Sequence, residues 1–122
     1  MVDHIGLKVK NLDASVRFYE AALKAVGYVV CSRDESSAGL GPPGEPSLWL
    51  LPGGKGGGAA GVHVAFRAQD RGAVDRFFKA GVEAGGRDNG GPGIRKDYSP
   101  TYYAAFVFDP DGNNIEVVSH SA

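Results

Sequence analysis

The sequence has 122 residues, 43% of them hydrophobic and 22% charged, which is enough for one domain with a core of its own. Its 13 Lys and Arg residues nearly balance its 14 Asp and Glu residues, and no basic run occurs, which argues against nucleic acid as a partner. No apolar stretch approaches the roughly 18 residues of a membrane span, and the single cysteine and an N-terminus unlike a signal peptide favour a cytoplasmic protein.

The first half of the chain is expected to form one strand, one helix and three further strands. Apolar residues alternate over 5–9, and a helical pattern follows over 12–25, between a capping residue, Asn11, and a terminating glycine, Gly27. The three further strands are expected over 28–33, 37–41 and 47–52.

The second half repeats this pattern 59 residues later. When His4 is placed on His63, seven of 25 aligned pairs are identical: His4/His63, Ala14/Ala73, Arg17/Arg76, Phe18/Phe77, Ala21/Ala80, Ala25/Ala84 and Gly27/Gly86. Asn11 then falls on Asp70, which predicts a second helix over 71–84. The region from 86 to 100 is poor in strand formers, and strands are expected over 102–108 and 114–119, on either side of a DPDGN turn.

These patterns predict an α+β fold with a single domain. Two repeated βαβββ modules, residues 1–52 and 61–122, are joined by a glycine-rich linker at 53–60. We expect them to form a cupped mixed sheet with the helices on its outer side.

Strand alternation places two histidines and one glutamate on the same face of this sheet. The apolar residues of each strand must face the helices, so His4, His63 and Glu116 face the other way, into the cup. Two imidazoles and a carboxylate on a concave surface form a set of metal ligands. Any one of these residues alone is more often an ordinary surface group, but the equivalence of the two histidines in the repeat favours ligands.

Three motifs resemble the vicinal oxygen chelate superfamily, which includes glyoxalase I, bleomycin- and fosfomycin-resistance proteins, extradiol dioxygenases and methylmalonyl-CoA epimerase. They are DHIGLKVKNLDASVRFYEAAL at the front, GVHVAF in the middle and FVFDPDGNNIEVV at the end. The resemblance covers essentially the whole chain and is not specific for one reaction. It implies a divalent metal held by the first, fourth, fifth and eighth strands, with His4, His63 and Glu116 as ligands and Glu116 also catalytic.

The sequence departs from this family pattern at the fourth ligand. Alternation within 47–52 puts Trp49 at the position that matches Glu116, and tryptophan cannot bind a metal. Glu45 is the nearest carboxylate, but it precedes the strand. Glyoxalase I and the epimerase look to need a fourth ligand, whereas three ligands suit Fe(II) oxygen chemistry, or Zn, Ni, Co or Mn acting as a Lewis acid. A site that has lost its metal, with Trp49 in an apolar binding cup, is the other interpretation.

Further candidate binding residues lie around the seventh expected strand. Tyr98, Tyr102 and Tyr103 are candidates for stacking on or hydrogen-bonding a substrate, although two of them could equally cap the core. Arg95 is placed where it could bind an anionic substrate or remain solvated. His120 lies four residues after Glu116, near the C-terminus, and would share its face if the strand continues.

The sequence therefore supports two functions. The first is a small metal-dependent enzyme of the lyase, isomerase or dioxygenase type, whose metal chelates adjacent oxygens of a small-molecule substrate. The second is a metal-free protein that sequesters an aromatic, drug-like compound. A homodimer is expected, because residues 48–51 are apolar on both faces of their strand, and the cup could form within one chain or across two.

Overall fold

The computed structural model describes residues 1–53, 58 and 60–122, so most of the expected linker at 53–60 lies outside the described residues. The first half of the chain contains β1 (Ile5–Val9), α1 (Leu12–Leu23), a short 3-10 helix η1 (Lys24–Val26), β2 (Val29–Arg33), β3 (Ala38–Gly41) and β4 (Leu48–Pro52). The second half contains β5 (His63–Arg67), α2 (Arg71–Glu83), β6 (Arg87–Asp88), β7 (Gly93–Ile94), β8 (Tyr103–Phe108) and β9 (Asn114–Ser119).

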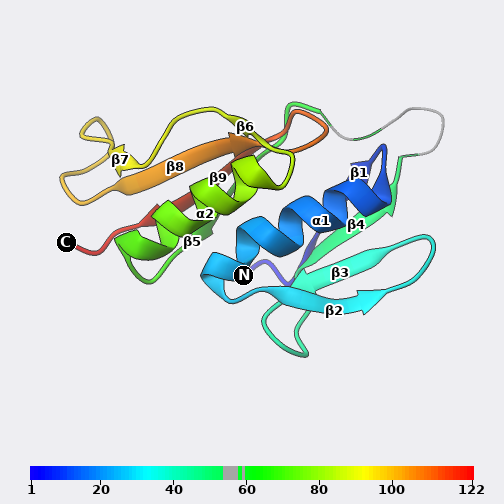
Figure 1. Cartoon of the computed structure of the whole chain (residues 1–122). Helices are drawn as coiled ribbons and strands as arrows, with labels where there is room; N and C mark the ends of the chain where they lie inside the picture. Colours follow the sequence, from blue (N-terminus) through cyan, green and yellow to red (C-terminus); the bar gives the residue numbers. More distant parts are fainter. Residues whose placement is uncertain (54–57, 59) are drawn as a thin grey trace.

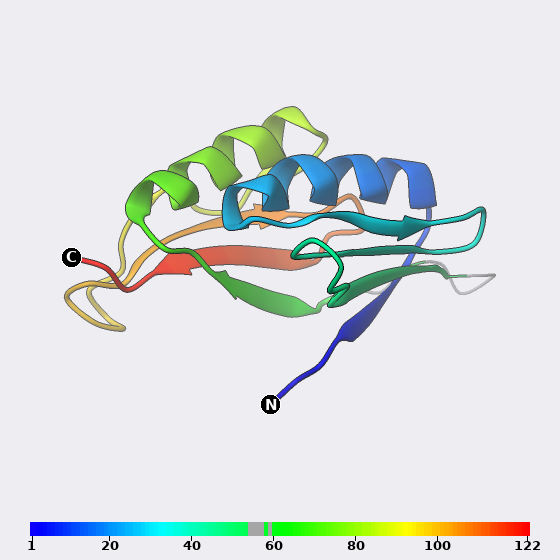
Figure 2. The ribbon, with the colours of Figure 1, turned by 90° about the horizontal axis from the view of Figure 1, so that it is seen from below.

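The strands form two mixed sheets, one from each half of the chain (Figure 1). The first sheet has the order β1-β4-β3-β2, and the second has the order β5-β9-β8-β6, with β7 also paired to β8. In both sheets the first strand of the half runs parallel to its last, β1 to β4 and β5 to β9. Both helices lie on the same side of the sheets, as Figure 2 shows, so the predicted α+β class and the one-sided helices are confirmed.

Across the described residues, the two sheets are not joined into one. β1 is the end strand of the first sheet and β5 is the end strand of the second, and the described residues contain no pairing between them. The cupped single sheet expected from the sequence is therefore divided at the boundary between the two halves. Each half leaves one strand edge unpaired at that boundary.

Both helices begin where the sequence predicts. The side chain of Asn11 accepts a hydrogen bond from the Ala14 N–H at 3.0 Å, and that of Asp70 accepts one from the Ala73 N–H at 2.8 Å. After α1 and η1, Gly27 adopts φ +85°, a left-handed conformation that ends the helical segment.

The core lies between the helices and the sheets. The fully buried side chains of greatest volume are Phe18, Tyr19, Leu23, Leu40, Leu48, Leu50, Phe77 and Ile115. The helices approach closely because Gly81 has no side chain; a Cβ there would already contact Ala22 and Phe18 at 3.5 Å. Within the described residues, no helix is long and apolar enough to cross a membrane.

The second half differs from the predicted pattern between its helix and β8. Where one strand was expected and few strand formers occur, two strands of two residues each, β6 and β7, pair with β8. The edge of β8 offers backbone donors and acceptors that these residues can use despite their poor strand propensity.

Candidate functional site

The second sheet brings His63 and Glu116 together. β5 and β9 are paired with Ala65 opposite Glu116, so His63, two residues before Ala65, lies on the same face as the carboxylate. His63 Nε2 is 3.1 Å from Glu116 Oε1, and Glu116 is only 3% exposed. Two of the three predicted ligands thus form a close pair on the face away from the helices.

The hydrogen bond of His63 Nδ1 determines which ring nitrogen is free to bind a ligand. Nδ1 lies 3.0 Å from the backbone carbonyl oxygen of Asn114, which can only accept a hydrogen bond. In that bond Nδ1 carries the proton, so Nε2 of the neutral ring keeps its lone pair for a metal and donates to Glu116 only when the ring is protonated. This is the arrangement usual for metal-binding histidines, whose second nitrogen donates to a carbonyl or a carboxylate.

The remaining oxygen of Glu116 is held by a tyrosine. The hydroxyl of Tyr102 donates to Glu116 Oε2 at 2.5 Å. Burial, followed by this hydrogen bond and the charge of Glu116, raises the pKa of Tyr102 to about 12. Tyr102 therefore stays protonated near neutral pH, and both carboxylate oxygens have a partner.

These residues open onto a cavity of about 740 Å³ with an aromatic wall. The Phe106 ring stacks on His63 at a centroid distance of 6.3 Å, and the Tyr98 ring meets that of Tyr102 at 4.9 Å. The cavity is lined by His63, Asp97, Tyr98, Ser99, Tyr102, Phe106, Asn114, Glu116 and His120. Phe106 was missed by the sequence analysis; alternation in 102–108 puts it on the face of Tyr102, and the β8–β9 register puts it opposite Glu116.

His4 lies elsewhere in the chain, in a second cavity of about 620 Å³ that shares no lining residue with the first. Its Nδ1 contacts Asp3 Oδ1 at 2.6 Å, and its side chain is 56% exposed. Among the residues that the structure describes, no group of three His, Cys, Asp or Glu side chains could hold a metal. The expected convergence of His4 with His63 and Glu116 is thus absent from a single chain, because β1 and β5 belong to separate sheets.

Trp49 stands in the first module where Glu116 stands in the second. Trp49 is opposite Gly6 in the β1–β4 pair, just as Glu116 is opposite Ala65 in the β5–β9 pair. Its ring covers Gly39, where a Cβ would come within 2.9 Å of it. Trp49 lines the cavity of His4, and so does Glu45 from the loop before β4.

The family model of the glyoxalase/bleomycin resistance protein/dioxygenase superfamily matches residues 1–117. The chain belongs to this superfamily. Among solved structures it is similar to a glyoxalase/bleomycin resistance protein from Albidiferax ferrireducens, with 28% identity, a TM-score of 0.84 and 98% of each chain covered. A glyoxalase I mutant from Zea mays is 25% identical with a TM-score of 0.71. That alignment covers 96% of this chain and 46% of the maize chain. No curated protein matched the sequence.

Two other predicted residues of this superfamily member do not line the cavity of His63. The Tyr103 hydroxyl donates to Asp75 Oδ1 at 2.7 Å, because successive strand residues point to opposite faces and Tyr103 faces α2. The Arg95 guanidinium lies over the Phe106 ring and donates to the carbonyl of Gly91 at 2.7 Å. The structure therefore brings neither residue to the cavity's lining.

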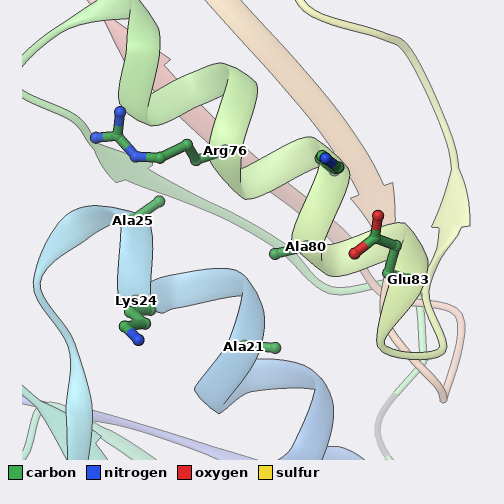
Figure 3. A pocket seen from close by; sticks show the side chains of 7 residues that line it. Ala21, Lys24, Ala25, Arg76, Ala80 and Glu83 are labelled. Atoms are coloured by element: carbon green, nitrogen blue, oxygen red, sulfur yellow. The ribbon is translucent and has the colours of Figure 1, made fainter.

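A further cavity of about 430 Å³ lies between the two helices (Figure 3). It is lined by Ala21, Lys24, Ala25, Arg76, Lys79, Ala80 and Glu83. Its alanine floor follows from the close approach of α1 and α2, and its charged side chains are exposed. None of the predicted site residues lines it.

Proposed function

We propose that this protein is a small metal-dependent enzyme of the lyase, isomerase or dioxygenase type, acting on a small molecule with two neighbouring oxygen atoms. The observation that carries the proposal is the geometry of His63. Its Nδ1 is held by the Asn114 carbonyl, which leaves Nε2 beside the buried carboxylate of Glu116. An imidazole and a carboxylate suit Fe, Zn, Ni, Mn and Co, and the donor pair fits such an ion.

We infer that the third ligand, His4, comes from a second copy of the chain. β1 and β5 each present an unpaired edge, and exposed edges in natural proteins are usually covered. Residues 1–4 are exposed, and the N-terminus lies apart from the rest of the chain in Figure 2. In the proposed homodimer, β1 of one subunit lies beside β5 of the other, and His4 of the first faces His63 and Glu116 of the second.

The chemistry divides between the ion and the chain. A divalent ion would act as a Lewis acid on the two neighbouring oxygens of the substrate. We assign to the buried Glu116 carboxylate the uptake of a proton from the bound substrate. Tyr98 and Phe106 form an aromatic wall against which the substrate would pack.

The test is a metal titration of the purified protein after treatment with a chelator. We expect one ion per chain for at least one of Fe(II), Zn, Ni, Mn and Co, and its loss in His4→Ala, His63→Ala and Glu116→Ala. Asp75→Ala is the control, because it removes a carboxylate on the helix side of the same sheet, and it should bind as the wild type does. Absence of binding for all five metals would overturn the proposal, as would unchanged binding in Glu116→Ala.

A second candidate function is the metal-free sequestration of an aromatic compound. It is favoured by Trp49, whose ring lies at the fourth-ligand position and rests on Gly39. Trp49 is the only tryptophan of the chain, so its fluorescence reports on the cavity of His4 directly. Quenching by planar aromatic compounds in chelator-treated protein, with no metal binding under any condition, would favour this function over the enzyme.

A further inference from the structure

The side chain of Tyr102 forms a hydrogen bond with Glu116, one of the proposed metal ligands. Its hydroxyl donates to Glu116 Oε2 at 2.5 Å, while Oε1 of the same carboxylate faces His63 Nε2 at 3.1 Å. We propose that Tyr102 is a positioning residue, which holds Oε2 so that Glu116 presents Oε1 alone at the ligand position beside His63. This inference rests on the proposed function for the presence of a metal, but the contact itself belongs to the protein without one.

The burial of Glu116 explains why a donor is needed there. A carboxylate that is 3% exposed is costly unless hydrogen bonds satisfy its oxygens. The Tyr102 hydroxyl satisfies Oε2, and His63 Nε2 can donate to Oε1 only when its ring is protonated. While Nε2 of His63 binds a metal it cannot donate a proton, and the Tyr102 hydroxyl then becomes the side-chain donor that remains on the carboxylate.

Backbone hydrogen bonds and ring contacts hold Tyr102 in place, so the direction of its hydroxyl is restricted. Its backbone N–H donates to the Ser99 carbonyl at 3.3 Å, and its own carbonyl accepts from the Arg95 N–H at 2.7 Å. Its ring meets the Tyr98 ring at a centroid distance of 4.9 Å and the His120 ring at 5.3 Å, both edge to face. A hydroxyl has one proton to donate, and this one is directed at Glu116.

The neighbouring residue provides a matched control. Tyr103 also donates its hydroxyl to a carboxylate, that of Asp75, but on the helix side of the sheet. Tyr102→Phe and Tyr103→Phe therefore remove the same atom and the same kind of hydrogen bond from adjacent positions. Only the first change touches the proposed ligand set.

The test is a Co²⁺ titration of the chelator-treated full chain, followed by calorimetry and by the visible absorption of the bound ion. We expect Tyr102→Phe to bind Co²⁺ about 10- to 100-fold more weakly, the usual effect of removing a partner of a metal ligand. The absorption spectrum should also change, because the freed Oε2 alters the coordination. Tyr103→Phe should match the wild type in both. Wild-type affinity and spectrum in Tyr102→Phe would overturn the inference.

A second measurement needs no metal and separates this inference from the proposed function. In ¹³C-labelled, metal-free protein near neutral pH, the Glu116 side-chain carboxyl resonance should move in Tyr102→Phe and stay in Tyr103→Phe. An unchanged Glu116 resonance in Tyr102→Phe would contradict the positioning role of Tyr102, whatever the metal titration shows. If the resonance moves but wild-type protein binds no metal, the contact stands and the proposed enzyme falls.

Discussion

Tyr19 is a buried residue that connects the two halves of the chain through a side-chain hydrogen bond. Its hydroxyl, on α1, donates to Asp109 Oδ2 of the second half at 2.5 Å, and both residues are buried. Asn113 Nδ2 donates to the same carboxylate oxygen at 3.0 Å. The bond joins the end of β8 to the helix of the other half.

Removing this hydroxyl should destabilise the protein. Tyr19→Phe leaves a buried carboxylate short of a donor, and we expect the free energy of unfolding to fall by about 1–3 kcal/mol in urea denaturation. Tyr103→Phe, which loses a bond at the surface, should change it by less than about 0.5 kcal/mol. Equal effects of the two changes would contradict the role given to Tyr19.

The same residue predicts a pH dependence. Burial, and then the charge of Asp109, raises the pKa of Tyr19 well above its ordinary value. The folded state therefore holds this proton more tightly than the unfolded state, and the resulting stability is present below about pH 10 and is lost as the pH rises further. The stability difference between wild type and Tyr19→Phe should narrow above that pH, which urea denaturation at several alkaline pH values would check.

Asp111 and Asp34 should respond to substitution with opposite signs. Burial raises the pKa of Asp111, and its Oδ2 is a buried atom without a hydrogen bond among the described residues. Because the folded pKa is raised, stability is lost as the pH rises above about 4, so Asp111→Asn should raise the melting temperature at pH 7 and not at pH 3.

Hydrogen bonds from Ser36 and Ser37 lower the pKa of Asp34, so Asp34→Asn should lower the melting temperature at pH 7. Thermal melts at both pH values decide between these signs.

At the scale of elements, the repeated glycines Gly27 and Gly86 do different physical work. Gly27 is required for its backbone conformation, because φ is +85°, although nothing lies within 4 Å of an added Cβ. Gly86 needs space instead: a Cβ there would lie 2.5 Å from Val107 and 2.6 Å from Phe18. The identity of the two residues in the repeat therefore hides two separate requirements.

Gly86→Ala should consequently be costly. The methyl group would push apart α1, α2 and β8, and overpacking of this kind costs about 1–3 kcal/mol. Gly91→Ala is the matched control, since nothing lies within 4 Å of a Cβ there and its φ is not positive. Urea denaturation of the two variants checks this, and a mild effect of Gly86→Ala would show that the three elements can separate easily.

The elements that the sequence predicts well are those with strong local signals. The helix starts at Leu12 and Arg71 and the strand Asn114–Ser119 follow from capping residues and alternation alone. β6 and β7 were not predictable in this way, because their pairing comes from the edge of β8 rather than from their own residues. Local signals also place Glu116 on the correct face but cannot show that Tyr102 reaches it, since that contact depends on how the turn before β8 packs.

At the scale of the whole molecule, the unpaired edges of β1 and β5 should make the protein a dimer. We expect sedimentation at micromolar concentration to give a mass about twice the 12.7 kDa of one chain. Ala65→Glu puts a charge on β5 at the proposed interface and should weaken the dimer. Val29→Glu, at an exposed position on the far strand β2, should not. A single species near 12.7 kDa would contradict the shared site.

The division of the chain into two sheets, each with half of the ligands, has a consequence for mixed populations. If His4 and Glu116 act from different subunits, neither His4→Ala nor Glu116→Ala alone can form a site, but a heterodimer of the two variants contains one site with both changes and one with neither. Random exchange of equal amounts makes half of the dimers mixed, so about a quarter of the wild-type metal-binding capacity should return on mixing. Two inactive proteins would thus complement each other in the test tube, as proteins with a site inside one chain cannot.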